Sequence, residues 1–168
     1  YKNILKEIPK ENVLEISVVS PYFDKEGKVI QQLQRDFSPQ KINVLIDESG
    51  ILPSEFPFEK YNNVKFYHWK DAKNEFNDNF NRLHAKLIHF QYLDKEILVF
   101  GSANATISAL GDENNDGINS EVSLLIKREK RDKNWLKQLQ IKTPEKTIHY
   151  DIIKNFKKNN YTTENKIK

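Results

Sequence analysis

Hydrophobic and polar positions along the chain form short segments with either strand-like or helix-like periodicity. Residues 28–37 carry apolar side chains at helical spacing, which predicts an amphipathic helix that ends before Pro39. Compact apolar runs bounded by turn residues predict strands, over residues 14–19, 42–46, 64–69, 83–93, 97–100 and 121–126. Two further short helices are expected, over residues 103–110 and 132–140.

This order of elements predicts an α/β fold with one mixed, largely β sheet flanked by helices. Residues 49–63 contain Gly50 and two prolines, which is typical of a loop with a short helical turn, and residues 71–82 indicate a loop or weak helix. The length of 168 residues suits one domain. We expect a catalytic domain over residues 1–150 and a basic, mobile tail over residues 151–168.

Charge is distributed unevenly along the chain. The net charge is +3, but residues 127–168 hold 13 Lys/Arg against 5 Asp/Glu, while residues 1–126 have a net charge of −5. The basic segment is either a solvated surface with a frayed end or an arm that lies along a polyanion.

The chain has no Cys, which excludes disulfides, thiolate metal sites and a Cys nucleophile. No apolar run approaches the ~18 residues of a membrane-spanning helix. The chain lacks Met and starts at Tyr1, so we expect it to come from a longer translation product, with a cytoplasmic location as the working assignment.

Chemistry-bearing residues gather in the second half of the chain. Strand alternation places His84 and Lys86 on one face, and the returning strand brings Gly101 and Ser102 to the same end of the sheet. Ser102 and Asn104 then flank a predicted helix start, where free amides favour an anion. These groups together suit a tetrahedral phosphate. In contrast, His68 is interpreted as an ordinary strand end, and His149 supports no hypothesis.

His84-x-Lys86, Asp94 and Gly101-Ser102-x-Asn104 resemble the signature of the phospholipase D superfamily. The spacing between Asp94 and Gly101 is the usual six residues, whereas seven residues rather than four separate Lys86 from Asp94. Ser20-Pro21-Tyr22-Phe23 and Asn119-x-Glu121 are similar to features of nuclease-like members. The resemblance extends over residues 14–126.

The resemblance implies a catalytic set and a reaction without a metal ion or other cofactor. Its catalytic residues would be His84, Lys86, Ser102, Asn104, Glu121 and Asp94, and its substrate-binding residues would be Lys86, Ser102, Asn104, Gly101, Ser20 and Tyr22. His84 would attack a phosphodiester and form a phosphohistidine, while Lys86, Ser102 and Asn104 would hold the non-bridging oxygens. Glu121 would accept a hydrogen bond from the other nitrogen of His84.

The family's site needs two such motifs, and one is present here. A homodimer would supply the second motif across a two-fold axis, or a second phospholipase D-like half of the parent protein would do so. The leading hypothesis is a nuclease acting on nucleic acid, most readily DNA. The alternatives are a phospholipase or phosphatidyltransferase, a weakly catalytic nucleic-acid-binding or dimerisation module, and an unrelated α/β domain.

Overall fold

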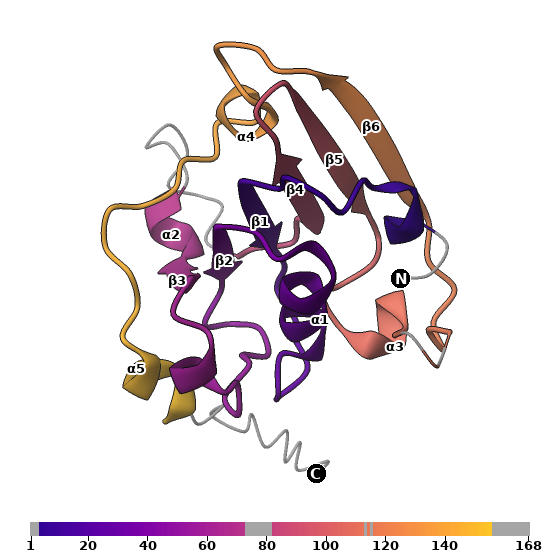
Figure 1. Cartoon of the computed structure of the whole chain (residues 1–168). Coiled ribbons are helices and arrows are strands. Elements are labelled where there is room, and N and C mark those ends of the chain that lie inside the picture. Colours follow the sequence, from indigo (N-terminus) through magenta and orange to yellow (C-terminus); the bar gives the residue numbers. More distant parts are fainter. Residues whose placement is uncertain (1–3, 73–81, 113, 115, 156–168) are drawn as a thin grey trace, which may run out of the picture.

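A six-stranded mixed sheet forms the centre of the computed structural model, which describes residues 4–72, 82–112, 114 and 116–155 (Figure 1). The strands lie in the order β3-β2-β1-β4-β5-β6. Their bounds are β1 Glu15–Val19, β2 Lys41–Ile46, β3 Val64–His68, β4 Leu87–Gln91, β5 Lys95–Gly101 and β6 Ser123–Glu129. The first three strands are parallel to one another, and β4, β5 and β6 continue the sheet in antiparallel pairs.

The helices are short except for α1. Their bounds are α1 Lys28–Phe37, α2 Trp69–Ala72, α3 Ile107–Leu110, α4 Trp135–Gln138 and α5 Tyr150–Lys154, with 3-10 turns at η1 Leu5–Glu7 and η2 Phe58–Lys60. The mixed α/β class predicted from the sequence is therefore confirmed. No helix among the described residues is long and apolar enough to cross a membrane.

The two faces of the sheet have different cores. One face packs Ile16, Val44 and Phe90 against the apolar side of α1 in the larger cluster. The other face has a smaller apolar cluster under α4, with Leu98 and Leu136 among its members. This second face also holds a row of buried polar side chains, which are Ser17, Asn43, His89 and Glu96.

Several elements differ from the sequence-based expectation. α3 begins at Ile107 rather than at residue 103, because the Thr106 side chain caps it by accepting from the Ala109 amide. α4 is also shorter than the expected helix over residues 132–140. β6 was expected to be buried, but its residues are exposed or half-buried. It is an edge strand, paired with β5 along one edge and with no described strand along the other.

The packed domain continues past the boundary expected at residue 150. Ile153 of α5 is fully buried in the larger core, and Lys154 pairs with Glu59 at 2.9 Å. The rest of the expected tail, residues 156–168, lies outside the described residues, as do residues 73–81 of the expected loop or weak helix.

Candidate functional site

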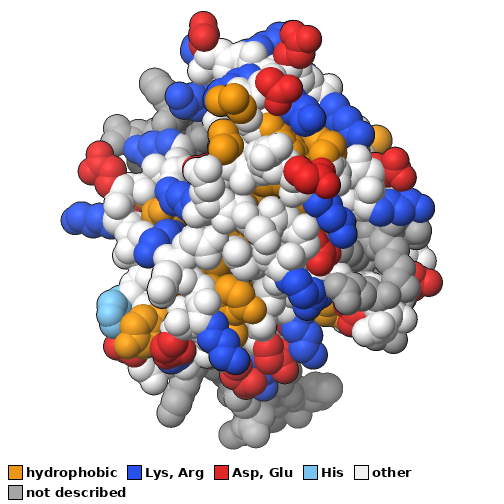
Figure 2. Space-filling model, in the orientation of Figure 1, with side chains coloured by type: hydrophobic (Ala, Val, Ile, Leu, Met, Phe, Trp, Pro, Cys, Tyr) orange, Lys and Arg blue, Asp and Glu red, His pale blue; other side chains and the backbone are white. Residues whose placement is uncertain are grey.

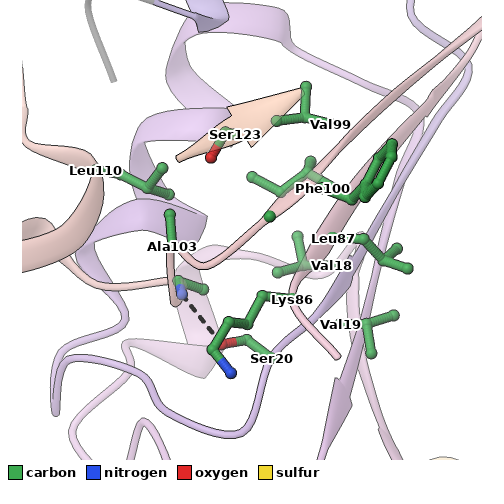
Figure 3. Close-up of a pocket in the computed structure, with 13 residues that line it drawn as sticks. Val18, Val19, Ser20, Lys86, Leu87, Val99, Phe100, Ala103, Leu110 and Ser123 are labelled. Carbon is green, nitrogen blue, oxygen red and sulfur yellow. Dashed lines mark hydrogen bonds between the residues drawn. The ribbon is translucent and has the colours of Figure 1, made fainter. Parts of the chain in front are cut away.

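The candidate site lies at the end of the sheet where β1, β2 and β5 finish and β4 begins. A shallow pocket at this end is lined by apolar strand residues together with Ser20, Lys86, Gly101 and Ser123. Figure 3 shows Lys86 beside Ser20, with Val18, Val99 and Leu110 among the other residues that line the pocket. Antiparallel pairing of β4 with β5 accounts for the meeting of Lys86 and Gly101, which share a backbone hydrogen bond of 3.2 Å.

His84 and Lys86 form a close pair on the exposed segment before β4. Lys86 Nζ lies 2.8 Å from His84 Nδ1 and donates to the His84 carbonyl oxygen at 2.8 Å. When the ammonium also donates to Nδ1, the proton of the neutral imidazole resides on Nε2. Burial lowers the pKa of Lys86, whereas Tyr22 and Glu121 act in the opposite direction.

Ser102 and Glu121 form the second pair of the site. Ser102 Oγ donates to Glu121 Oε2, and it accepts from the Val122 amide at 3.0 Å. Asn119 donates to the other carboxylate oxygen at 3.3 Å. The hydrogen bond expected between His84 and Glu121 is not among those formed by the described residues. Glu121 accepts from Ser102 and Asn119, because it lies just before β6, two residues after Asn119 and beside Ser102 at the end of β5.

A clamp formed by the loop after β1 fixes the position of the Gly-Ser-x-Asn segment. The Ser20 hydroxyl is buried; it accepts from the Ala105 amide at 3.0 Å and donates to the Tyr22 carbonyl at 2.9 Å (Figure 3). Asp24 accepts from the Ile107 amide at 3.1 Å, and burial raises the pKa of this carboxyl. These amides are therefore occupied, and the expected anion site at a helix start near Ser102 is not formed.

The close packing of the chain at the start of β6 requires a glycine at position 101. A Cβ at residue 101 would lie 2.1 Å from the Val122 carbonyl oxygen, so any side chain would separate β5 from β6. This is a different reason from the close approach to a ligand expected from the sequence. Asn104 is half-buried, and its Oδ1 has no hydrogen-bond partner among the described residues.

Asp94 is separated from the rest of the set. It lies exposed in the turn between β4 and β5, where its carbonyl oxygen accepts from the Lys130 amide at 2.8 Å. β4 alone places it roughly 16 Å from the His84 end of the strand. The structure thus brings together His84, Lys86, Ser102 and Glu121, with Ser20 and Tyr22 beside them, and leaves Asp94 at the opposite end.

Two residues that sequence analysis did not single out also position the site. Asp47, which follows β2, accepts from the Leu83 amide at 2.5 Å and from the Ser49 amide at 2.8 Å. It therefore anchors the segment that carries His84. Arg82 donates to the Tyr22 hydroxyl at 3.0 Å. The signal for Asp47 was its place at the end of a buried parallel strand, the sheet end where binding residues gather in open α/β sheets.

Part of the basic C-terminal segment is used in internal contacts. Lys127 donates to the Glu7 carbonyl oxygen at 2.9 Å, and Arg128 forms an ion pair with the buried Glu96. On the face in Figure 2, basic and acidic side chains are interspersed rather than gathered by sign. The described part of this segment therefore resembles a mixed surface more than a continuous basic arm.

No protein-family model matches the chain, and no curated protein does. Solved structures of yeast tyrosyl-DNA phosphodiesterase match it with TM-scores of 0.38–0.39. Identity is 16–19%, and the match covers 58–60% of this chain but 23–24% of the yeast enzyme. Two of these structures are the H432R and H182A mutants of that enzyme, in its own numbering.

Proposed function

We propose that this chain is a phosphodiesterase that cleaves nucleic acid through a covalent phosphohistidine, without a metal ion. The observation that carries the proposal is the exposed His84 imidazole, paired with the Lys86 ammonium at 2.8 Å beside the Ser102–Glu121 pair. A nucleophile, a cation and a hydroxyl donor at one open sheet end are what attack on a phosphodiester requires.

His84 attacks phosphorus through the imidazole nitrogen that bears the lone pair. The bond between phosphorus and the leaving oxygen breaks, and a second imidazolium protonates that oxygen to release an alcohol. The second imidazole then takes a proton from water, whose oxygen attacks phosphorus, and the phosphorus–nitrogen bond breaks to restore His84. Atoms and charge balance over the two steps, and the net reaction is hydrolysis.

Lys86 links substrate binding to the availability of His84. In the substrate-free arrangement the ammonium is directed at Nδ1 of His84. A phosphate oxygen competes for that ammonium, so binding frees the imidazole lone pair and neutralises the negative charge on the substrate. Ser102 is held by Glu121 and donates to a second phosphate oxygen after exchanging partners. Asn104 completes the proposed set, with its side-chain amide nitrogen as the donor to a phosphate oxygen.

A second copy of this chain supplies the second imidazole in our proposal. Leu124 and Ile126 lie on one face of the edge strand β6 and are 58% and 37% exposed, and Val122, just before the strand, is 76% exposed. This apolar stripe is continuous with Glu121 and Ser123 of the site, and an uncovered apolar edge is a site for pairing. We infer that a two-fold axis at this stripe brings the two His84 side chains to one shared site.

Cleavage assays in EDTA test the chemistry. Wild type should cleave single- or double-stranded DNA, and His84→Ala should lower the rate at least about 10³-fold. Phosphate-labelled substrate should leave base-stable label on wild-type protein and none on His84→Ala. Absence of cleavage by wild type, or release of choline from phosphatidylcholine vesicles instead, would contradict the proposal.

His68→Ala is the matched control, because His68 pairs with Glu48 at 3.2 Å on β3. β3 lies three strands from β4, about 14 Å away at ordinary strand spacing. Retained activity supports a second imidazole from another copy. Loss of activity would mean that the acid comes from within the same chain.

Sedimentation tests the dimer directly. The double variant Leu124→Glu with Ile126→Glu should sediment as a monomer and lose about 100-fold in activity, while Leu93→Glu, at an exposed turn, should change neither. Wild-type specific activity should also fall on dilution, which does not depend on whether the double variant folds. A fully active monomer would overturn this part of the proposal.

A further inference from the structure

Arg82 begins the short segment, residues 82–86, that carries His84 and Lys86. It donates to the Tyr22 hydroxyl at 3.0 Å, and Tyr22 acts to raise the pKa of Lys86 against the larger lowering effect of burial. His84 and Lys86 contact each other at 2.8 Å, so these three side chains and Tyr22 form one continuous polar strip. Arg82, His84 and Lys86 occur at alternate positions of the irregular segment that precedes β4.

Tyr22 gives Arg82 a fixed support. The Tyr22 backbone forms a bridge with Ile51, and the Ser20 hydroxyl donates to its carbonyl oxygen at 2.9 Å. Ile51 and Ser20 thus hold the Tyr22 backbone in place, and the Tyr22 hydroxyl is the acceptor for the Arg82 guanidinium. The carboxylate of Asp47 contacts the residue next to Arg82, but it accepts from the Leu83 and Ser49 amides.

The guanidinium of Arg82 has more donors than its support uses. It is exposed, and the hydrogen bond to Tyr22 engages one of its five N–H groups. The planar fork that remains suits two oxygens of one phosphate, whereas an ammonium acts as a point charge. An arginine two residues before the nucleophile is therefore suited to bind a phosphate next to the one that reacts.

We propose that Arg82, oriented by Tyr22, binds the phosphate adjacent to the scissile phosphodiester and so selects polynucleotides over substrates with a single phosphodiester. This inference rests on the proposed function of the same site. It narrows the substrate class, since a nucleic-acid strand offers a neighbouring phosphate and a simple diester such as a phospholipid does not.

Two substrates separate this role from a general effect on catalysis. Arg82→Gln should raise KM for a single-stranded oligodeoxynucleotide about ten-fold, and kcat/KM for bis(4-nitrophenyl) phosphate should stay within two-fold of wild type. Arg82→Lys should recover only part of the KM loss, because the fork is missing. Arg131→Gln, an exposed arginine between β6 and α4, is the matched control and should change neither substrate.

A binding measurement in the His84→Ala background keeps the inference separable from the proposed function. Adding Arg82→Gln should weaken oligodeoxynucleotide binding about ten-fold and reduce the salt slope of log Kd by about 0.7, the value for one single-strand phosphate contact. Equal losses on both substrates, or no change in binding and slope, would overturn the role of Arg82. Binding that depends on Arg82 in a protein that cleaves nothing would contradict only the proposed function.

Discussion

Two histidines five residues apart have opposite surroundings. His84 precedes β4, is exposed, and lies 2.8 Å from the Lys86 ammonium. His89 lies within β4, is fully buried, and contacts the Glu96 carboxylate at 2.6 Å. Each imidazole has a charged neighbour on a short stretch of chain. Solvent access separates a group that can meet a substrate from one that supports the sheet.

The buried histidine belongs to a network that fastens α4 to the sheet. Glu96 accepts from Arg128 Nε at 2.6 Å and from the Trp135 amide at 3.0 Å, and the Arg128 guanidinium stacks 3.7 Å from the Trp135 ring centroid. Burial lowers the pKa of His89 despite the nearby carboxylate. Burial opposes ionisation of Glu96, but the bonds from Trp135, His89 and Arg128 outweigh it, so the net pKa of Glu96 is lowered. The lowered pKa of His89 and the lowered pKa of Glu96 are both consistent with a neutral His89 beside a charged Glu96–Arg128 pair.

Neutralising one carboxylate in each region tests whether the buried network stabilises the fold and the exposed pair serves activity. Glu96→Gln should cost about 3–5 kcal/mol of unfolding free energy, because it leaves the charge of Arg128, whose side chain is only 11% exposed, without its carboxylate partner. Glu121→Gln should change that free energy by less than about 0.5 kcal/mol, since Glu121 is only half-buried. It should instead lower phosphodiesterase activity about ten-fold by releasing Ser102.

Urea unfolding at pH 7 and cleavage assays on the same two variants check this contrast. Similar stability losses in both variants would show that the Ser102–Glu121 pair also supports the fold. A stable Glu96→Gln protein would show that the Glu96–Arg128 pair contributes little.

A smaller effect is expected from pH. Below about pH 6.5 the unfolded chain protonates His89 while the folded chain keeps it neutral, so stability falls as the pH falls, by up to about 1.4 kcal/mol per pH unit. Glu96 adds a further loss below about pH 4.5, because its folded pKa is lowered and the unfolded carboxyl protonates first. Stability should thus be greatest above pH 6.5 and decline through both windows.

Urea midpoints measured from pH 7.5 to 4 test this profile. His84→Ala is the control and should leave the slope between pH 6.5 and 5 in place, whereas His89→Asn should reduce it. A flat profile in wild type, or a slope that disappears in His84→Ala, would assign acid sensitivity to other groups.

Part of the site could be predicted from the sequence because a short hairpin is a local feature, although the strand expected over residues 83–93 is confined to β4 and leaves His84 and Lys86 in the segment before it. The pairing of β4 with β5 follows from their closeness along the chain, and it brings Lys86 to Gly101. The α1 bounds also follow from local periodicity and match the expectation at both ends.

Other features depend on long-range packing that the sequence pattern does not contain. His89 interrupts an apolar run between Ile88 and Phe90, and only the sheet order shows that it faces the polar row of the second face. Similarly, the apolar pattern of β6 is the same for a central strand and an edge strand. The partner of Glu121 depends on how β6 meets the end of β5.

The smallest expected effect concerns Asp94, at the opposite end of β4 from His84. Because its contact with Lys130 uses the backbone carbonyl, Asp94→Asn keeps that bond and removes only an exposed charge. We expect kcat/KM within two-fold of wild type and an unfolding free energy within about 0.5 kcal/mol. Lys95→Gln, at the neighbouring first residue of β5, is a control for the loss of one charge at this end of the sheet. A large loss of activity with unchanged stability would instead give Asp94 a part in catalysis despite roughly 16 Å of separation, and would require β4 to transmit it.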